Sequence, residues 1–237
     1  MNRFTFAQCR DSFDIDPGFA DDNVIETDGP LSALPKLKFR RHGSPGLVVA
    51  GCRFRLATSA GGNIAIYAAE SDAVVEIGAA TRLNCDIRLW RSARVVIGAH
   101  TTINQARLVA DNSDIIIGAD CMFSDSILVQ SADQHGLIDL ATMEFSNAHR
   151  RHITLGDHVW IGRRAVIMPD VTIGDGTVIG TSSLVTKDAG SCCTCVGIPA
   201  REVRSGSSWT RLPGRISPRE AEFFARMRAQ GVIGSAP

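Results

Sequence analysis

Histidine side chains are concentrated in one segment of the chain, residues 131–152, whose sequence does not repeat. The segment holds three of the six histidines, and His158 follows shortly after it. A neutral imidazole can take a proton from a hydroxyl group at physiological pH, so histidine is the first candidate for a general base. The segment therefore predicts proton-transfer chemistry on a substrate hydroxyl. Its histidines are His135, His149 and His152.

The sequence on both sides of this segment is periodic. Residues 71–130 align as three rows of twenty, and from residue 155 an aliphatic residue stands at every sixth position. A fixed period of this size is typical of a solenoid, and the abundance of Val and Ile favours short strands over helices. We therefore predict an all-β solenoid, a parallel β-helix with three short strands per turn. The sixth-position residues are Leu155, Ile161, Ile167, Ile173, Ile179 and Val185.

Two details of the repeat lead to further expectations. A turn of twenty residues exceeds three hexads by two, so the early turns should bulge. Gly162, Gly174 and Gly180 are expected where the backbone bends or takes a positive φ. Because an interruption of a rigid scaffold is where functional groups usually lie, residues 131–152 are expected to form a loop that leaves the coil.

The chain divides into three parts in this interpretation. Residues 1–45 lack a clear period and are expected to form an irregular lead-in that caps the solenoid. Residues 46–204 form the solenoid itself. Residues 205–237 form an extension with one helix over 217–231, since Ser217 and Glu220 make a capping box and Gly231 a stop. Its apolar residues Phe223, Phe224 and Met227 are expected to pack on the coil.

Composition narrows the partners and the compartment. Lys and Arg together number 25, as do Asp and Glu, so no overall positive charge favours nucleic acid. The sequence has no apolar run long enough for a membrane span and no signal-peptide pattern. Seven scattered cysteines fit a reducing, cytoplasmic environment. The cluster Cys192, Cys193 and Cys195 lacks a second spaced pair of ligands, so no metal is expected.

Three stretches carry a resemblance to a known family: SADQHGLIDLATMEFSNAHRRHITLGDHVWIG, RRAVIMPDVTIGDGTVIGTSSLVTKD and VGIPAREVR. Together they resemble the left-handed β-helix (hexapeptide-repeat) acyltransferases over about residues 71–204. Within that family the similarity is to sugar and capsular-polysaccharide O-acetyltransferases, which are related to the maltose and galactoside acetyltransferases. The most specific matches are the Asp-x-His at residues 133–135, the motif GDHVWIG, and the tail from VTKD to GIPAR.

The resemblance implies a function and an assembly. The fold would be a left-handed parallel β-helix that forms a homotrimer, with active sites between subunits. The reaction would be acetyl transfer from acetyl-CoA to a hydroxyl of a sugar or polysaccharide, in glycan biosynthesis. Transfer would be direct, because both substrates can be held together without a covalent enzyme intermediate.

The family's catalytic positions map onto five residues of this sequence. His135 matches the general base. Trp160 matches the residue whose backbone N–H would meet the oxyanion and whose indole would pack along the pantetheine arm. Asp133, Asp139 and Asn147 match recurring polar positions, which would orient His135 or hold the acceptor.

The coenzyme positions map onto the second half of the repeat. Thr181, Thr186 and Lys187 match residues that line the coenzyme groove. Arg201 and Arg204 match basic residues near the phosphates, for which Arg and Lys are the natural partners. Arg163 departs from the family, which often has a small residue there, and would narrow the coenzyme channel or bind its phosphates.

Other functions remain open from the sequence. An amino-sugar N-acetyltransferase is a near neighbour of the leading hypothesis. A γ-carbonic-anhydrase-like zinc hydratase uses the same coil with three histidines on zinc, although the histidine spacing here does not match that set. A non-catalytic scaffold trimer is the third class. The sequence contains no readable code for the acceptor or for the role of residues 1–60.

Overall fold

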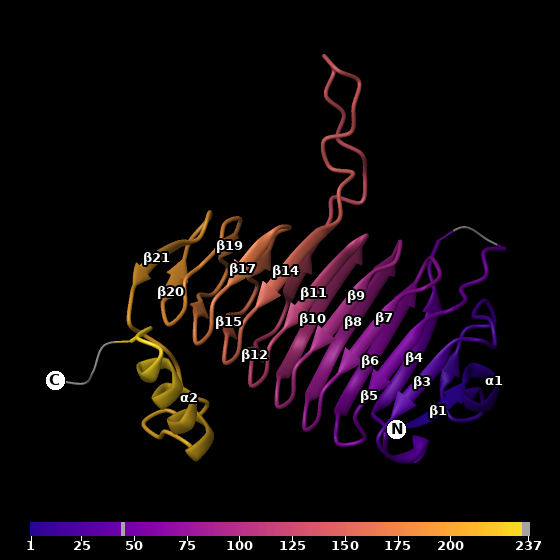
Figure 1. The fold of residues 1–237 in the computed structure, drawn as a ribbon, viewed down its shortest axis with the longest axis horizontal. Coiled ribbons are helices and arrows are strands. Elements are labelled where there is room, and N and C mark those ends of the chain that lie inside the picture. Colours follow the sequence, from indigo (N-terminus) through magenta and orange to yellow (C-terminus); the bar gives the residue numbers. More distant parts are fainter. Residues whose placement is uncertain (44–45, 234–237) are drawn as a thin grey trace.

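The chain winds as a stack of coils, with the N-terminus at one end and a short helix at the other (Figure 1). The computed structural model describes residues 1–43 and 46–233. Strands of successive coils pair in parallel, so the sheets run along the length of the stack. The first sheet contains β1 (Asn2–Thr5), β3 (Val24–Thr27), β5 (Arg53–Leu56), β7 (Val74–Ile77), β9 (Arg94–Ile97), β11 (Ser113–Ile117), β14 (Arg151–Leu155) and β17 (Val171–Ile173).

The second sheet covers the rest of each coil and branches partway along the stack. Strand β10 pairs with both β12 and β13 of the following coil, and two separate rows continue from there. One row contains β2 (Asp14–Ile15), β4 (Lys36–Arg41), β6 (Gly61–Ala68), β8 (Arg82–Trp90), β10 (Thr102–Asp111), β12 (Met122–Phe123), β15 (Trp160–Ile161), β18 (Val178–Ile179), β20 (Thr194–Val196) and β21 (Arg201–Arg204). The other row contains β13 (Ile127–Gln130), β16 (Val166–Ile167) and β19 (Leu184–Val185).

This branching corrects the expectation of three short strands in every turn. In the twenty-residue coils a short strand such as β7 alternates with a long one such as β8, which has nine residues. In these coils, which are two residues longer than three hexads, one corner is absent and the chain continues there as a single long strand. The expected bulge occurs in β10, where the register shifts between Ile103 and Ala106. Three strands per turn appear only from β12 onward, and the step falls to eighteen residues after the arm, from β14 to β17 and from β15 to β18.

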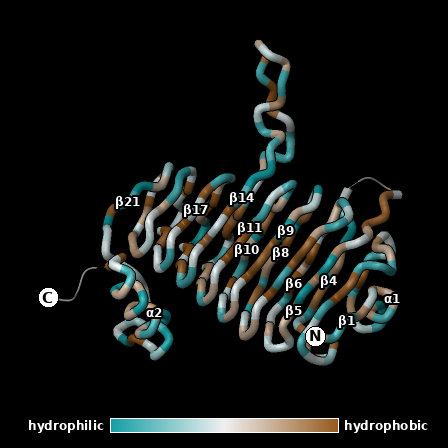
Figure 2. The backbone as a smooth tube through the Cα atoms, in the orientation of Figure 1, coloured by the Kyte–Doolittle hydropathy of each residue, from teal (hydrophilic) through white to brown (hydrophobic). Residues whose placement is uncertain are grey.

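The core is the column of inward side chains that the periodicity predicted. All six sixth-position residues from Leu155 to Val185 are buried. Hydrophobic and hydrophilic residues alternate along the strands in Figure 2, as expected when every second side chain points inward. The hexad pattern therefore identified the core correctly.

The N-terminal residues differ from the expected irregular lead-in. Strands β3 and β4 stack in parallel on β5 and β6, so the coil begins well before residue 46. Aromatic side chains fill this end of the core in place of the aliphatic period, which explains why the repeat was not visible in the sequence. Strand β1 pairs antiparallel with β3 and helix α1 (Phe6–Cys9) lies beside it, closing the end of the stack. The expected boundary at residue 45 lies outside the described residues. The aromatic cluster consists of Phe6, Phe19, Phe39 and Phe54.

Glycines in the repeat allow neighbouring coils to approach closely, and they are not needed there for unusual backbone angles. Gly162, Gly174 and Gly180 do not have a positive φ, so that alternative of the expectation is wrong. A Cβ added at any of the three would lie 2.4–2.7 Å from atoms of the next coil. The positive φ values fall instead on the residues that turn the corners, among them Asp120, His158, Arg164 and Ser182.

We expect Gly98→Ala to destabilise the stack. The added Cβ would lie 2.5 Å from the carbonyl carbon of Gly118 and 2.6 Å from the amide nitrogen of Ala119, both backbone atoms of the following coil. Overpacking of this kind typically lowers the free energy of unfolding by about 1–3 kcal/mol. Urea denaturation measures the change, and Gly190→Ala is the control, since its Cβ would meet no atom within 4 Å. Equal stability of both variants would contradict the prediction.

The C-terminal extension docks on the coil through a buried histidine. Helix α2 (Pro218–Ala229) has the predicted capping box of Ser217 and Glu220, and its Phe223 and Met227 pack against Cys192. His158 is 1% exposed, and its ring stacks on Trp209 at 4.4 Å. Residues 234–237 of the predicted extension lie outside the described part of the chain.

Both ring nitrogens of His158 face acceptors. Nδ1 lies 2.8 Å from Asp120 Oδ2 and Nε2 lies 3.0 Å from the carbonyl oxygen of Trp209. Arg211 of the extension contacts Asp120 Oδ1 at 3.0 Å from the other side. We call His158, Asp120, Arg211 and Trp209 the latch. It joins the extension to two neighbouring coils.

Candidate active site

A protruding arm leaves the coil between β13 and β14, where the repeat is interrupted (Figure 1). Its outer part is a narrow antiparallel hairpin, with a bridge between Ile138 and Phe145. Asp139 makes the turn at the tip: its Oδ1 accepts hydrogen bonds from the N–H groups of Ala141 and Thr142 at 2.7 and 3.2 Å. Asp139 therefore shapes the arm, and no hydrogen bond links it to His135 in the described residues.

The base of the arm is held by Asn147. Its Nδ2 donates to the backbone oxygen of His135 at 2.8 Å and to Asp133 Oδ2 at 3.0 Å, and its Oδ1 accepts from the N–H of Leu137 at 2.8 Å. These bonds fix the backbone on both sides of His135. Asn147 and Asp133 thus position the histidine through its main chain rather than through its ring.

The His135 side chain is exposed at this point of the arm. Its ring nitrogens have no hydrogen-bond partner within residues 1–43 and 46–233. Gln134 before it takes a φ of 61°, which turns the chain at the base of the arm. An exposed imidazole on a fixed backbone can accept a proton from a substrate hydroxyl that approaches from outside the coil.

A carboxylate network lies beside the base of the arm and was not identified from the sequence. Arg151 Nη1 donates to Asp170 at 2.7 Å and Arg151 Nη2 to Asp133 at 3.4 Å. Burial opposes ionisation of Asp170, but hydrogen bonds from the His152 N–H and from Arg151 outweigh it and lower the pKa of Asp170. His149 Nε2 lies 3.5 Å from the same carboxylate. The network ties the arm to the following coil.

Trp160 lies on β15. The corner that follows this strand is not the corner from which the arm leaves the coil. Its backbone N–H donates to the oxygen of Thr177 at 2.9 Å, in the ladder between coils. That N–H is therefore not available for an oxyanion, and the expected role of this group is wrong. The half-buried indole donates to Ser124 Oγ at 3.4 Å.

Two edges of the coil stack collect most of the predicted residues. The tryptophan edge consists of the corners 162–165 and 180–183, which follow β15 and β18. It contains Arg163, whose Nε donates to Asp125 at 2.8 Å, and Thr181. The arm edge consists of residues 131–135, 168–170 and 186–188, which follow β13, β16 and β19, and it contains His135, Thr186 and Lys187.

The two edges lie on opposite sides of the row β13, β16 and β19, so within one chain these strands separate His135 from Trp160. Arg201 and Arg204 are exposed on β21, which pairs antiparallel with β20 at the end of the stack. A single chain therefore presents two half-sites. The exposed His135 lies on the arm edge, basic and hydroxyl side chains lie on both edges, and β21 carries two arginines.

Among the described residues, no group of three or more His, Cys, Asp or Glu side chains is placed to hold a metal ion. In the described chain, no helix has both the length and the apolar character needed to cross a membrane.

Comparison with known proteins confirms the resemblance seen in the sequence. Residues 152–187 match the family model for the bacterial transferase hexapeptide (six repeats). The polysialic acid O-acetyltransferase of Escherichia coli O1:K1 / APEC is 28% identical over 138 residues, which cover 58% of this chain and 45% of that protein. The galactoside O-acetyltransferase of Escherichia coli (strain K12) is 52% identical over 52 residues, covering 22% of this chain and 26% of that one. The chain thus spans less than half the length of the curated relatives it matches.

A solved structure shares the fold over nearly the whole chain. The crystal structure of the polySia-specific acetyltransferase NeuO superposes with a TM-score of 0.73 at 24% identity, covering 88% of this chain and 100% of that one. The structure of the polysialic acid O-acetyltransferase OatWY gives a TM-score of 0.53 at 19% identity, covering 90% of this chain and 94% of that one. At these identities the likeness shows a common fold.

Proposed function

We propose that this chain, which carries the hexapeptide repeat of bacterial transferases, is an acetyl-CoA-dependent O-acetyltransferase that acts on a hydroxyl of a sugar or polysaccharide. The coil in this proposal is a left-handed parallel β-helix, the form implied by the resemblance. One observation carries the proposal: the exposed ring of His135 lies on a backbone that Asn147 holds in place, at the base of an arm that interrupts the coil just before the matched repeat. The acetyltransferase names of the relatives support the reaction class.

The proposed reaction needs a base for the acceptor hydroxyl and a thioester that donates the acetyl group. His135 takes the proton from the acceptor hydroxyl while the hydroxyl oxygen attacks the thioester carbonyl. The tetrahedral intermediate collapses, the carbon–sulfur bond breaks, and the proton passes from His135 to the departing thiolate. The products are the acetyl ester and coenzyme A, and no covalent enzyme intermediate is involved.

The intermediate needs a hydrogen-bond donor for its oxygen. Because the N–H of Trp160 is committed to Thr177, we assign this role to the N–H of Arg163 on the tryptophan edge. Arg163 is exposed, and its N–H has no acceptor among the described residues. The indole of Trp160 keeps its proposed place beside the pantetheine arm.

An active site with both edges needs more than one copy of the chain. His135 lies on the arm edge and Arg163 on the tryptophan edge, so a second subunit has to bring the two together. We therefore propose a homotrimer with the active sites between subunits. The arm supports this arrangement. Leu140, Met143 and Phe145 on its outer part are 81%, 67% and 63% exposed, and a neighbouring subunit would bury these apolar side chains. Light scattering at several concentrations tests the assembly.

The coenzyme would be held along both edges. Thr181 and Arg163 lie on the tryptophan edge, and Thr186 and Lys187 on the arm edge that a neighbouring copy would supply. Arg201 and Arg204 at the end of the stack would meet the phosphates.

We expect the double variant Arg201→Gln/Arg204→Gln to weaken coenzyme A binding by roughly three- to tenfold, because each exposed charge contributes at most about 1 kcal/mol. Calorimetry with coenzyme A measures the dissociation constant. Arg215→Gln is the control, as an exposed arginine in the extension away from these residues. Unchanged affinity of the double variant would remove both arginines from the site.

The decisive experiment is a screen of sugar and amino-sugar acceptors with acetyl-CoA, with product detected by mass spectrometry. Ester formation on a hydroxyl supports the proposal, whereas amide formation assigns the N-acetyltransferase alternative. Absence of any acetylated product would contradict both. The compartment proposed is the cytoplasm, which is consistent with the seven cysteines being buried free thiols.

A further inference from the structure

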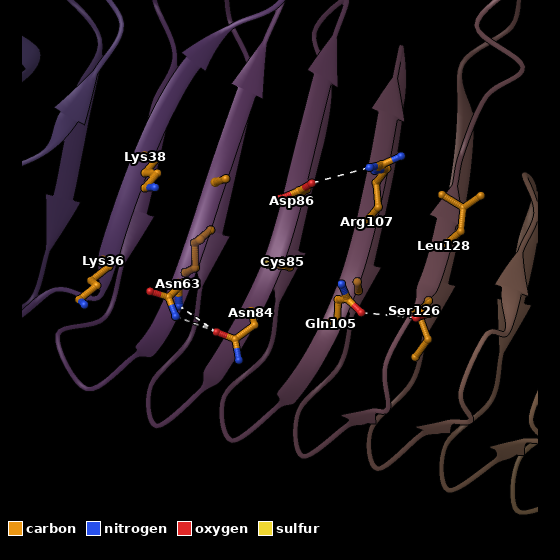
Figure 3. A pocket seen from close by; sticks show the side chains of 14 residues that line it. Lys36, Lys38, Asn63, Asn84, Cys85, Asp86, Gln105, Arg107, Ser126 and Leu128 are labelled. Atoms are coloured by element: carbon orange, nitrogen blue, oxygen red, sulfur yellow. Dashed lines mark hydrogen bonds and ion pairs between the residues drawn. The ribbon is translucent and has the colours of Figure 1, made fainter.

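A groove lies on the outer face of the early coils and ends at β13, the strand that precedes the arm. It has a volume of about 830 Å³ and crosses the strands β4, β6, β8, β10 and β13 (Figure 3). These are the coils in which the twenty-residue step straightens one corner into continuous strand. The groove therefore lies on the part of the stack that departs from the eighteen-residue repeat. Nothing in the proposed mechanism uses it.

Polar side chains form a row along the groove, one from each coil. Lys36 is the register partner of Asn63, which in turn is the partner of Asn84, and Gln105 and Ser126 continue the row. Asn63 Nδ2 donates to Asn84 Oδ1 at 3.1 Å, and Ser126 Oγ donates to Gln105 Oε1 at 3.4 Å. The side-chain nitrogens Nδ2 of Asn84 and Nε2 of Gln105 have no acceptor within the described residues, so they are available to a ligand.

A second row beside it is basic. Lys38, Asp86 and Arg107 lie on the same face, and Arg107 reaches Asp86 at 3.9 Å. Neither Lys36 nor Lys38 has a carboxylate within 4.0 Å in the described parts of the chain. Asp14, the register partner of Lys38, is bound to Arg40 instead. The groove thus has three cations against one lining carboxylate, in a chain whose formal net charge is zero.

The groove continues toward the proposed active site. Its last residue along the row, Ser126, follows Asp125, which accepts the hydrogen bond from Arg163 on the tryptophan edge. A molecule lying in the groove would therefore point one end at the edge where the thioester is proposed to sit. The opposite end would reach Lys36, several coils away.

From these features we infer that the groove binds the acceptor lengthwise, as an extended anionic glycan. This inference rests on the proposed acetyl transfer and specifies its substrate class. Free amide donors suit sugar hydroxyls and carboxylates, and the unpaired lysines suit acidic groups on the chain. Since neighbouring strands lie about 4.8 Å apart, five strands extend over roughly 19 Å, enough for several sugar units.

Binding without coenzyme tests the inference. The probe is a series of sialic acid oligomers of increasing length, with neutral malto-oligosaccharides of equal length as the comparison, measured by calorimetry on the full chain. We expect affinity for the anionic series to rise with length and to fall at high salt, and the neutral series to bind weakly. The double variant Lys36→Gln/Lys38→Gln should weaken anionic binding by roughly three- to tenfold.

The matched control is Arg3→Gln/Arg53→Gln, which removes two exposed charges from the other sheet and should leave binding unchanged. Equal binding by the lysine variant and the wild type would overturn the inference. So would a change in the oligomeric state of the lysine variant, which would make the groove an interface between copies. Neither result bears on acetyl transfer itself, which fails only if no acceptor in the screen is acetylated.

Discussion

Replacing His135 with alanine is expected to lower the rate of acetyl transfer by about 10²–10⁴-fold, the usual contribution of a general base. The ring is exposed, and no described side chain contacts its nitrogens. Its removal should therefore leave the fold and the coenzyme affinity intact. Initial rates with saturating acetyl-CoA, together with calorimetry of coenzyme A, separate the two effects. The loss should appear in kcat.

The control for this variant is His149→Ala. His149 is a neighbour on the same arm, and its Nε2 lies 3.5 Å from Asp170 with the side chain 58% exposed. A surface contact of this kind contributes little, so activity should stay within a few-fold of wild type. If His149→Ala lost as much activity as His135→Ala, the arm as a whole rather than one imidazole would be required. Full activity of His135→Ala would remove it as the base.

The coil was predictable because one physical requirement repeats along the sequence. Each inward strand position must be aliphatic, so Ile161, Ile167 and Ile173 reveal the stack without any structure. The first coils escaped prediction for the opposite reason. There Phe39 and Phe54 fill the same interior with fewer, larger side chains, and the six-residue period disappears.

The sequence predicted a site residue correctly only where its role does not depend on a contact with another coil. His135 stands out as a histidine in the interrupting segment, and the structure places it exposed at the base of the arm. The N–H of Trp160 was assigned wrongly, because its partner Thr177 depends on the register between coils. The contact of His152 with Asp170 was missed, although their separation of 18 residues equals one coil and was a usable signal.

The latch between the extension and the coil shows where sequence reasoning ends. Arg211 lies outside the repeat, and its contact with Asp120 joins residues 91 positions apart. No period relates them, so only the folded chain shows the pair. The latch also shows that His158 has a structural role. Its ring lies among aromatic rings of the extension rather than near the arm.

We expect Asp120→Asn to destabilise the docking of the extension by about 3 kcal/mol, since removing one partner of a buried charge network leaves the others uncompensated. The Asp120 side chain is only 10% exposed, and it faces both His158 and Arg211. Hydrogen exchange of helix α2 and urea denaturation measure the change. The control is Asp114→Asn, which removes an ion pair with Arg150 whose side chains are 32% and 43% exposed and should cost less than about 1 kcal/mol.

The same carboxylate should make docking sensitive to acid. Burial alone would raise the pKa of Asp120, but the hydrogen bond from His158 and the charge of Arg211 outweigh it, so the pKa falls below the ordinary value of 3.8. A group with a lowered folded pKa stabilises fully above its unfolded pKa and loses that contribution as the pH falls through the folded one. The stability difference between wild type and Asp120→Asn should therefore be largest near neutral pH and shrink below about pH 4. A difference that stayed constant down to strong acid would mean that Asp120 stabilises the latch by shape and not by charge.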